Sequence, residues 1–446
     1  MKRDLTSGNV FKTLISFSLP FLLSYFLQTL YGMADLFIIG QFNGTDCTTA
    51  VSIGSQVMHM VTVVIVGLAM GATIMIGRSI GAKKQEETGT IIGNTVILFM
   101  VFSVGLAVLL LLLVRQVAAV MSTPEAAFEE TISYLAICFL GIPFITAYNI
   151  ISSIFRGMGD SKSPMYFAFI ACVANIVLDY LFIGALQMGA AGAALGTTIA
   201  QAISVIVSFI IIAKRETGIY LSVADFRPKR NVLGTLLKIG IPVAVQDGFI
   251  QVAFLVITII ANRRGLSDAA AVGVVEKIIG ILFLIPSTML ASVSALSAQN
   301  IGAKKHERVK QTLGYAVMIT VVFGVAASVL MQFQAETFVG LFTKDPSVVH
   351  MGGQYMRSYV WDCIFAGIHF SFSGYFCAYG KSAISFLHNS LSIILVRIPV
   401  AYFASAAFAD TLFPMGIASP AGSALSVLIC LGAYFWLHRK HAELFA

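Results

Sequence analysis

The stretch Ile-Gly-Ala-Lys-Lys at residues 80–84 occurs a second time at residues 301–305, which lies 221 positions later, about half of the chain away. Glu86 and Glu307 follow the two copies at equivalent places. The same spacing, or one residue more, relates further pairs: Tyr134 and Tyr355, Phe155 and Phe376, Gly159 and Gly380, Pro20 and Pro242, and Tyr180 and Tyr402. A repeat spread over whole halves of a chain indicates two structural copies of one unit.

The composition places both copies in a membrane. Of the 446 residues, 58% are hydrophobic and 11% are charged, whereas a soluble domain has about 25% charged residues. Residues 88–114 contain no charged side chain, and residues 163–213 contain only Asp179. Both runs exceed the roughly 20 residues that a helix needs to cross a bilayer. We therefore expect an all-α polytopic membrane protein.

The lengths of the apolar segments predict twelve membrane-spanning helices. The first six are expected near residues 11–39, 50–77, 90–114, 129–155, 164–185 and 188–213. The second six are expected near residues 233–262, 269–297, 312–333, 351–378, 385–408 and 414–437. The predicted domains are an N-terminal six-helix lobe at 1–215, a cytoplasmic linker at 216–232 and a C-terminal six-helix lobe at 233–446.

The distribution of charge in the loops predicts the orientation. Most of the 28 Lys and Arg residues lie near the two termini and in the loops after even-numbered helices, so the positive-inside rule places both termini in the cytoplasm. The repeated stretch then forms two cytoplasmic turns, as helix stops and orientation anchors. The first apolar segment is too long for a signal peptide and leads to Asp35 instead of a cleavage site. We expect a multi-pass protein of a bacterial or archaeal plasma membrane.

The number of helices per copy predicts how the copies are related. Six is an even number, so both copies begin and end on the same side of the membrane. They are therefore parallel repeats, related by a pseudo-two-fold axis along the membrane normal. Two such bundles are expected to surround a central cavity and to work as a monomer. Lobes that rock about a cavity are the basis of many secondary transporters.

Asp35 and Asp179 are the clear ionisable residues within the spans of the first copy. Inserting an ionisable residue at the centre of a membrane-spanning helix costs about 2.5–3.5 kcal/mol of free energy, so the presence of each one needs an explanation. Both predicted helices run outward, which places both carboxylates in the outer half of the membrane. Tyr31 and Asn175 precede them by one turn on the same faces. Four further polar residues are expected to complete a pocket: Gln28, Asn149, Thr197 and Gln201.

A pocket of this kind suits the handling of a cation. Burial disfavours a charged carboxylate and a second carboxylate disfavours it further, so a buried pair can hold a proton and release it when water enters. With hydroxyl and amide oxygens nearby, the pocket can instead bind Na⁺, and Asp35 and Asp179 are then the metal ligands. The alternative is that each aspartate is hydrogen-bonded and only holds helices together.

The charged residues of the second copy do not repeat this pattern. Arg397 aligns with Asn175, and Ala401 aligns with Asp179. Either Arg397 pairs with a carboxylate such as Asp362 or Asp247, or these three residues line the path of a substrate. His59, His369 and His388 do not form a metal-binding set, and the six cysteines show no paired or metal-like spacing. We expect no cofactor and no nucleic-acid partner.

Pro20 and Pro242 lie within the first and seventh predicted helices at equivalent places. A proline inside a helix removes a backbone hydrogen bond and bends the helix. One interpretation is a static kink. The other is that the first helix changes its bend when Asp35 is protonated.

These features resemble the multidrug and toxic compound extrusion (MATE) family over nearly the whole chain. The resemblance rests on the two six-helix repeats, the Gly-Ala-Lys-Lys turns, and Ser-Ala-Gln-Asn-Ile-Gly at residues 297–302. The run Asn-Ile-Val-Leu-Asp-Tyr at residues 175–180, together with Pro20, Tyr31 and Asp35, is similar to the DinF-like branch of that family.

The resemblance implies a cation site in the first lobe. It makes Asp35, Asn175, Asp179 and Thr197 the coupling site, with Tyr31 and Asn149 in its network and Pro20 as the bend. It also implies the export of organic cations and amphipathic compounds in exchange for H⁺ or Na⁺. Asp247 and Asp362 do not match the second-lobe carboxylates of the other main bacterial branch.

We therefore expect a secondary active multidrug efflux transporter and not an enzyme. The chain has no P-loop pattern for ATP, and no nucleophile–base or metal set for intramembrane catalysis. The alternative function is a flippase for a lipid-linked precursor. A flippase for a pyrophosphate-linked lipid needs a basic cavity, and the central spans offer few bases apart from Arg397.

Overall fold

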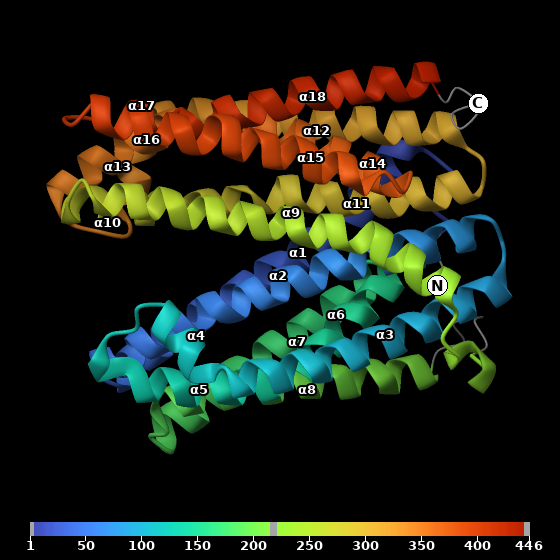
Figure 1. Ribbon diagram of the computed structural model, residues 1–446, viewed down its shortest axis with the longest axis horizontal. Coiled ribbons are helices and arrows are strands. Elements are labelled where there is room, and N and C mark those ends of the chain that lie inside the picture. Colours follow the sequence, from blue (N-terminus) through green and yellow to red (C-terminus); the bar gives the residue numbers. More distant parts are fainter. Residues whose placement is uncertain (1–3, 215–220, 441–446) are drawn as a thin grey trace. The chain divides into compact units, whose positions relative to one another are not determined.

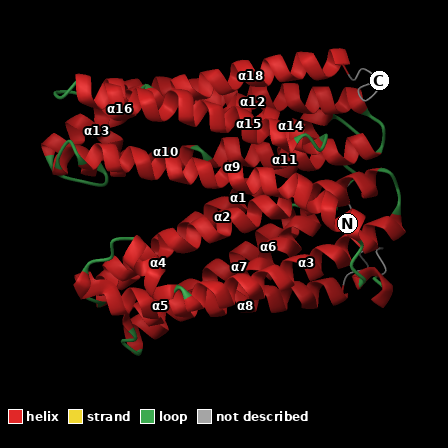
Figure 2. Ribbon diagram, in the orientation of Figure 1, coloured by secondary structure: helices red, strands yellow, loops and turns green. Residues whose placement is uncertain are grey.

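The computed structural model describes residues 4–214 and 221–440, and every regular element in these ranges is a helix (Figure 2). Ten helical stretches are long and apolar enough to cross a membrane. A bent pair, Glu125–Leu140 with Ile142–Gly157, raises the number to eleven if it counts as one span. The chain is therefore a multi-pass membrane protein with an all-α fold.

The helices of the first half follow one another closely along the chain (Figure 1). They are α1 (Val10–Phe42), α2 (Thr45–Gly81), α3 (Gln85–Leu112), α4 (Val114–Val120), η1 (Glu125–Ala127), α5 (Phe128–Leu140), α6 (Ile142–Gly157), α7 (Lys162–Asp179), η2 (Tyr180–Ala185), α8 (Gly189–Lys214) and η3 (Val223–Phe226). The six spans predicted for this half coincide with α1, α2, α3, the α5–α6 pair, α7 with η2, and α8.

The second half repeats this order. Its helices are α9 (Arg230–Asn262), α10 (Leu266–Leu282), α11 (Leu284–Gly302), α12 (His306–Gly340), α13 (Pro346–Tyr359), α14 (Asp362–Ala378), α15 (Ser382–Ser392), η4 (Ile393–Arg397), α16 (Ile398–Ala407), α17 (Phe413–Gly416) and α18 (Ala418–Lys440). The tenth predicted span, near 351–378, corresponds to α13 and α14, which two residues separate.

The two Gly-Ala-Lys-Lys stretches form the same turn. Lys83 and Lys304 adopt positive φ angles of 59° and 57°. At the next residue, the Lys84 amide donates to the Ser79 carbonyl at 3.0 Å, and the Lys305 amide donates to the Asn300 carbonyl at 2.8 Å. Bonds of this kind satisfy the last carbonyls of a helix. The repeat thus ends α2 and α11 in the same way.

The backbone contacts divide the chain into two compact units. The first unit contains Leu19–Gly240, and the second contains Leu5–Ser18 together with the chain from Ile241 onward. The predicted lobe boundaries at 215 and 233 stay a prediction. The contacts, however, assign residues 5–18 to the second unit and residues 230–240 to the first. Both α1 and α9 therefore belong partly to each unit.

Each unit has its own apolar core. In the first unit Ile38, Ile39, Leu135 and Phe139 are among the buried residues of one cluster. Small residues of α8 let neighbouring helices approach closely, as they do between many membrane helices. Helix α8 packs against α5, α6 and α7. This close packing positions the polar residues of α1, α7 and α8.

Candidate functional site

The polar cluster of the first unit forms where α1, α7 and α8 meet. Asp35 of α1 and Asp179 at the end of α7 are 3% and 0% exposed. The Thr197 hydroxyl of α8 donates a hydrogen bond to Asp35 Oδ2 at 3.1 Å. Asn175 Nδ2, one turn before Asp179, donates to Thr197 Oγ1 at 3.4 Å. The structure thus brings together the four residues that the sequence suggested as a coupling site.

The two carboxyl groups lie within hydrogen-bonding reach of each other. Ionised carboxylates only accept hydrogen bonds, so such a contact needs a shared proton or a cation between the groups. Among the residues that the structure describes, no Lys, Arg or His forms an ion pair with Asp35 or Asp179.

Several oxygens of this cluster accept no hydrogen bond from the described residues. Three are carboxylate oxygens of the aspartate pair, and the others are amide oxygens from the adjacent turns of α7 and α8. They are Asp35 Oδ1, Asp179 Oδ1, Asp179 Oδ2, Asn175 Oδ1 and Gln201 Oε1. A buried acceptor without a donor costs about 1–3 kcal/mol. A water molecule, a proton or a hard cation such as Na⁺ can satisfy oxygens of this kind.

Two local features fix the position of the Asp179 side chain. The helix changes to a π-helical turn, η2, immediately after this residue, and such turns are frequent at functional sites. A Cβ atom on Gly196 of α8 would collide with Asp179 Oδ1. Gly196 was not among the residues singled out from the sequence. The small residues at Gly192 and Gly196, four apart in an apolar helix, were the signal for such a close approach.

Of the remaining predicted residues of the first copy, Tyr31 and Gln201 are joined to each other by a hydrogen bond. Gln201 Nε2 donates to the Tyr31 hydroxyl at 3.4 Å. Asn149 instead donates to the Ile145 carbonyl of its own helix, at 2.8 Å. Gln28 is half-buried, and no hydrogen bond within the described ranges joins it to the aspartates. Pro20 lies in α1, fifteen residues before Asp35.

A tyrosine from the repeat also belongs to this environment. Tyr134 of α5 is buried, forms a hydrogen bond with Ser55 at 3.1 Å, and interacts electrostatically with Asp35. Its counterpart Tyr355 interacts in the same way with charged residues of the second unit. The sequence showed this pair only as a sign of duplication. Its position beside the acidic residues required the packing of distant helices.

The second unit contains a buried ion pair. Arg397 Nη2, at the end of the π-helical turn η4, donates to Asp362 Oδ2 at 2.7 Å. The Asp362 side chain is fully buried, and that of Arg397 is 8% exposed. Of the two alternatives drawn from the sequence, the structure shows the pairing with Asp362. Asp247 is half-buried, and Cys377 lies within its electrostatic reach.

Some further polar groups of the second unit are hydrogen-bonded within it. Glu276 accepts from the Thr258 hydroxyl at 3.4 Å. His388 shares a hydrogen bond with Ser373 at 3.0 Å, and its ring lies 5.5 Å from that of His369. In the described ranges no three His, Cys, Asp or Glu residues gather as a metal site.

Comparisons with known proteins agree with this architecture. A family model described as MatE matches the chain twice, over residues 20–181 and 242–403. The two matches begin at Pro20 and Pro242, so they reproduce the repeat found in the sequence. Together they cover well over half of the chain.

Relatives of this chain extend over almost its full length. The "Probable multidrug resistance protein YoeA" of Bacillus subtilis (strain 168) is 24% identical over 439 residues, which cover 97% of this chain and 95% of that protein. The "Probable multidrug resistance protein YpnP" of the same organism is 28% identical, covering 89% of this chain and 88% of that protein. A crystal structure of MATE in complex with MaL6 has the same fold, with a TM-score of 0.90, 22% identity, and coverage of 99% and 98%.

Proposed function

Because this chain belongs to the MatE family, we propose that it is a secondary active transporter that exports organic cations and amphipathic compounds in exchange for H⁺ or Na⁺. Its relatives over most of its length are named as probable multidrug resistance proteins, which supports the substrate class. The proposed location is the plasma membrane, with both termini in the cytoplasm and a single chain as the working unit. The alternation of access between the two sides is part of this proposal.

One observation carries the proposal of cation coupling: Asp35 and Asp179 are buried together, and no cationic side chain from residues 4–214 or 221–440 pairs with them. Leaving two carboxylates charged in a membrane is costly, so the pair is expected to hold a cation in at least one state. Bound H⁺ would let one carboxyl donate to the other. Bound Na⁺ would draw on the oxygens of Asp35, Asp179 and Asn175.

The proposed transport cycle depends on which side of the membrane gives water access to Asp35 and Asp179. When water enters from the outer side, H⁺ or Na⁺ from outside neutralises the carboxylates. When the site opens inward, the cation is released to the cytoplasm, where its concentration or the membrane potential is less favourable to binding. Each elementary charge that enters down roughly 100 mV gains about 2.3 kcal/mol. Pro20 allows α1 to change its bend as Asp35 changes its charge.

The experiment is transport of a fluorescent dye cation in proteoliposomes, under an imposed pH gradient and, separately, an imposed Na⁺ gradient. Wild type is compared with Asp35→Asn and Asp179→Asn, and with Asp46→Asn as the control. Asp46 is exposed in the first turn of α2. We expect one gradient to drive wild type and Asp46→Asn, and both buried variants to lose most of the transport.

The outcomes distinguish a coupling role of the two aspartates from a structural one, and the antiporter from the flippase. Normal transport by both buried variants would show that the aspartates are structural, and coupling would then be sought at Asp247 and Asp362. A wild-type protein that moves no dye under either gradient would overturn the multidrug proposal in favour of the flippase. The gradient that drives transport identifies the coupling ion.

A further inference from the structure

Helices α1 and α9 each pass from one compact unit to the other. The passage in α1 lies between Ser18 and Leu19, and that in α9 lies between Gly240 and Ile241. Both places are within two residues of a proline, Pro20 or Pro242. Because proline removes a helical hydrogen bond, these are points at which a helix bends most easily.

The residues that precede α1 are held by a set of donors in the second unit. Arg308 donates to the Gly8 carbonyl at 2.7 Å and to the Ser7 carbonyl at 3.1 Å. Lys305 Nζ donates to the Thr6 carbonyl at 2.7 Å, and Asn300 Nδ2 donates to the Leu5 carbonyl at 3.3 Å. We call Asn300, Lys305 and Arg308 the N-terminal clamp.

Two residues of the N-terminal clamp are hydrogen-bonded to each other, and apolar packing also holds the segment that the clamp binds. Arg308 Nε donates to Asn300 Oδ1 at 3.1 Å, so two of the clamp residues hold each other in place. Leu5, Leu14 and Phe17 are almost completely buried in an apolar cluster of the second unit. The segment from Leu5 to Ser18 is therefore fastened along its length.

The segment that precedes α9 is held in a corresponding way by the first unit. Asn94 Nδ2 of α3 donates to the carbonyls of Asp225 and Arg227, each at 3.1 Å. The Lys229 amide donates to Asn94 Oδ1 at 2.6 Å. Further along, Gly240 lies so close to the Leu68 carbonyl that a Cβ atom would collide with it. The same arrangement thus occurs twice, with different side chains.

The other end of α1 carries Asp35. The fifteen residues from Pro20 to Asp35 correspond to about 22 Å of helix, so a change of about 10° in the bend moves the far end by roughly 4 Å. The Asp35 carboxylate accepts its hydrogen bond from Thr197 at 3.1 Å. A displacement of that size is enough to break or form the contact.

We propose that the N-terminal clamp is a coupling device that links the charge of Asp35 to the movement of the second unit, with Arg308 as its main positioning residue. The link works because one rigid half of α1 is fastened by the clamp and the other half carries a residue of the cation site. This inference rests on the proposed antiport function. It assigns Arg308 no contact with substrate or coupling ion.

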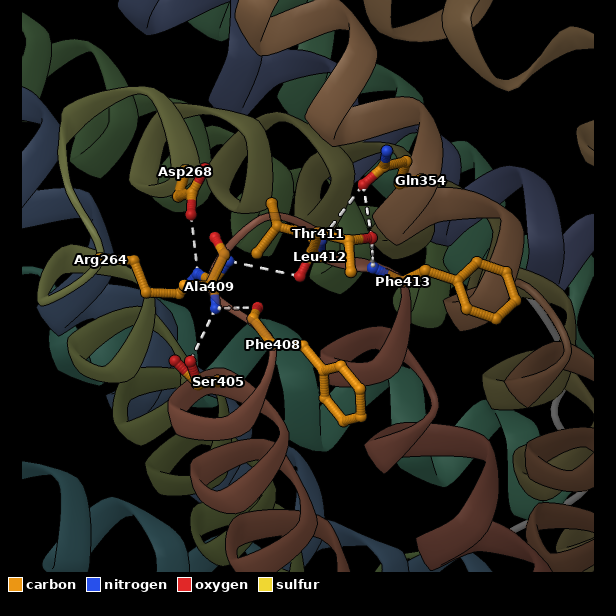
Figure 3. A network of polar contacts seen from close by, with 9 residues as sticks. All are labelled: Arg264, Asp268, Gln354, Ser405, Phe408, Ala409, Thr411, Leu412 and Phe413. Atoms are coloured by element: carbon orange, nitrogen blue, oxygen red, sulfur yellow. Dashed lines mark hydrogen bonds and ion pairs between the residues drawn. The ribbon is translucent and has the colours of Figure 1, made fainter.

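The test compares two arginines of the second unit. Arg264 also donates to backbone carbonyls, those of Ser405, Phe408, Ala409 and Thr411 (Figure 3). It is paired with Asp268 at 2.7 Å. Arg264 holds no part of the segment that leads into α1, the helix that carries Asp35, so Arg264→Gln is the matched control for Arg308→Gln.

We expect both variants to have a lower Tm in detergent, because each loses several charged hydrogen bonds. Only Arg308→Gln is expected to lose coupling. Its maximal rate of dye export should fall at least about fivefold with KM changed less than about twofold, and more of the coupling ion should enter without dye. A second variant, Gly8→Ala, tests the held segment itself, since Gly8 has a φ of +72° that alanine disfavours. It should change the rate in the same direction.

Equal rates in Arg308→Gln and Arg264→Gln, at equal amounts of folded protein, would overturn the inference while leaving the antiport function intact. A normal ratio of ions to dye in Gly8→Ala and Arg308→Gln would overturn it as well. A wild-type protein without dye transport would instead overturn the proposed function, and this inference with it.

Discussion

In the first unit Asp35 and Asp179 lie together with no cationic partner among the described residues, whereas in the second unit Asp362 is paired with Arg397 at 2.7 Å. Both arrangements are buried, and both have a tyrosine from the same repeat position nearby, Tyr134 or Tyr355. The scaffold was duplicated, but the electrostatics were not.

The difference explains why a cation site is proposed for one unit only. A carboxylate with its own arginine has no need of an external cation, so Asp362 is suited to holding helices in a fixed arrangement. A carboxylate pair without one can exchange its cation with the surrounding solution. The first unit is thus expected to respond to H⁺ or Na⁺, and the second to be insensitive to both at its ion pair.

The largest loss of stability is expected when Arg397, the cationic partner of Asp362, is removed. Arg397→Met leaves Asp362 buried and unpaired, which should lower the free energy of unfolding by about 3–5 kcal/mol. The double variant Asp362→Leu/Arg397→Met should recover most of this loss. Asp35→Asn removes no cationic partner and should cost less than about 1 kcal/mol. Chemical unfolding in detergent measures all of these, and equal losses in Arg397→Met and Asp35→Asn would contradict the comparison.

A smaller effect is expected from the hydroxyl that supports the carboxylate pair. Thr197→Val removes the donor to Asp35 Oδ2. Hydrogen bonds to charged groups contribute about 1.5–3 kcal/mol. Because this one stabilises the charged form of Asp35, its loss should change the concentration of coupling ion needed for half-maximal transport by at least about tenfold, and towards less H⁺ if the proton is the coupling ion. Ser328→Ala in the second unit is the control, because that hydroxyl donates to the Val360 carbonyl. An unchanged ion dependence in Thr197→Val would remove Thr197 from the site.

The space reserved for Asp179 gives a further test. Gly196→Ala forces a methyl group against the Asp179 carboxylate, and overpacking of this kind costs about 1–3 kcal/mol. We expect dye transport to fall, although no polar group has been removed. Gly105→Ala is matched to it, since nothing lies within 4 Å of that Cβ position. Equal transport in the two alanine variants would mean that the close approach is unimportant.

The smallest effect is a difference in local stability at low pH between the segment that leads into α9 and the segment that leads into α1. Hydrogen bonds from Ser222 and Thr90 hold the pKa of Asp225 below its usual value. A lowered pKa means that the charged form stabilises the folded linker above the ordinary value near 3.9, and that this contribution is lost as the pH falls through the folded pKa. The contacts that hold the segment near Gly8 end on backbone carbonyls, which do not titrate. Limited proteolysis at decreasing pH should therefore open the Asp225 segment before the segment near Gly8, and the reverse order would contradict the comparison.

Much of the fold could be predicted from local features of the sequence. The uncharged runs are longer than a bilayer requires, and the repeated turn at residues 80–84 and 301–305 relates the halves. Which polar residues gather in the first-unit cluster was also partly predictable, because Asp35 and Asp179 each have a polar residue one turn away on one helical face. Charged residues inside apolar helices are rare enough to be conspicuous.

Features that depend on distant packing could not be predicted in this way. Helical periodicity does not show that Gly196 touches Asp179, or that Tyr134 lies near Asp35, because those contacts join different helices. The pairing of Arg397 with Asp362 remained one of two alternatives for the same reason. The assignment of residues 5–18 to the second unit depends on Arg308, about three hundred positions away.

The exchange of segments between the two units also has a consequence for the synthesis of the protein. The carbonyls of residues 5–8 emerge from the ribosome long before Arg308, their partner in the folded chain. At about 5–20 residues per second, the delay is roughly 15–60 s. The second unit cannot be completed by its own half of the polypeptide, and the first helix must be inserted before its final neighbours exist. Two separately expressed halves, cut in the linker, would each lack a segment that the other carries.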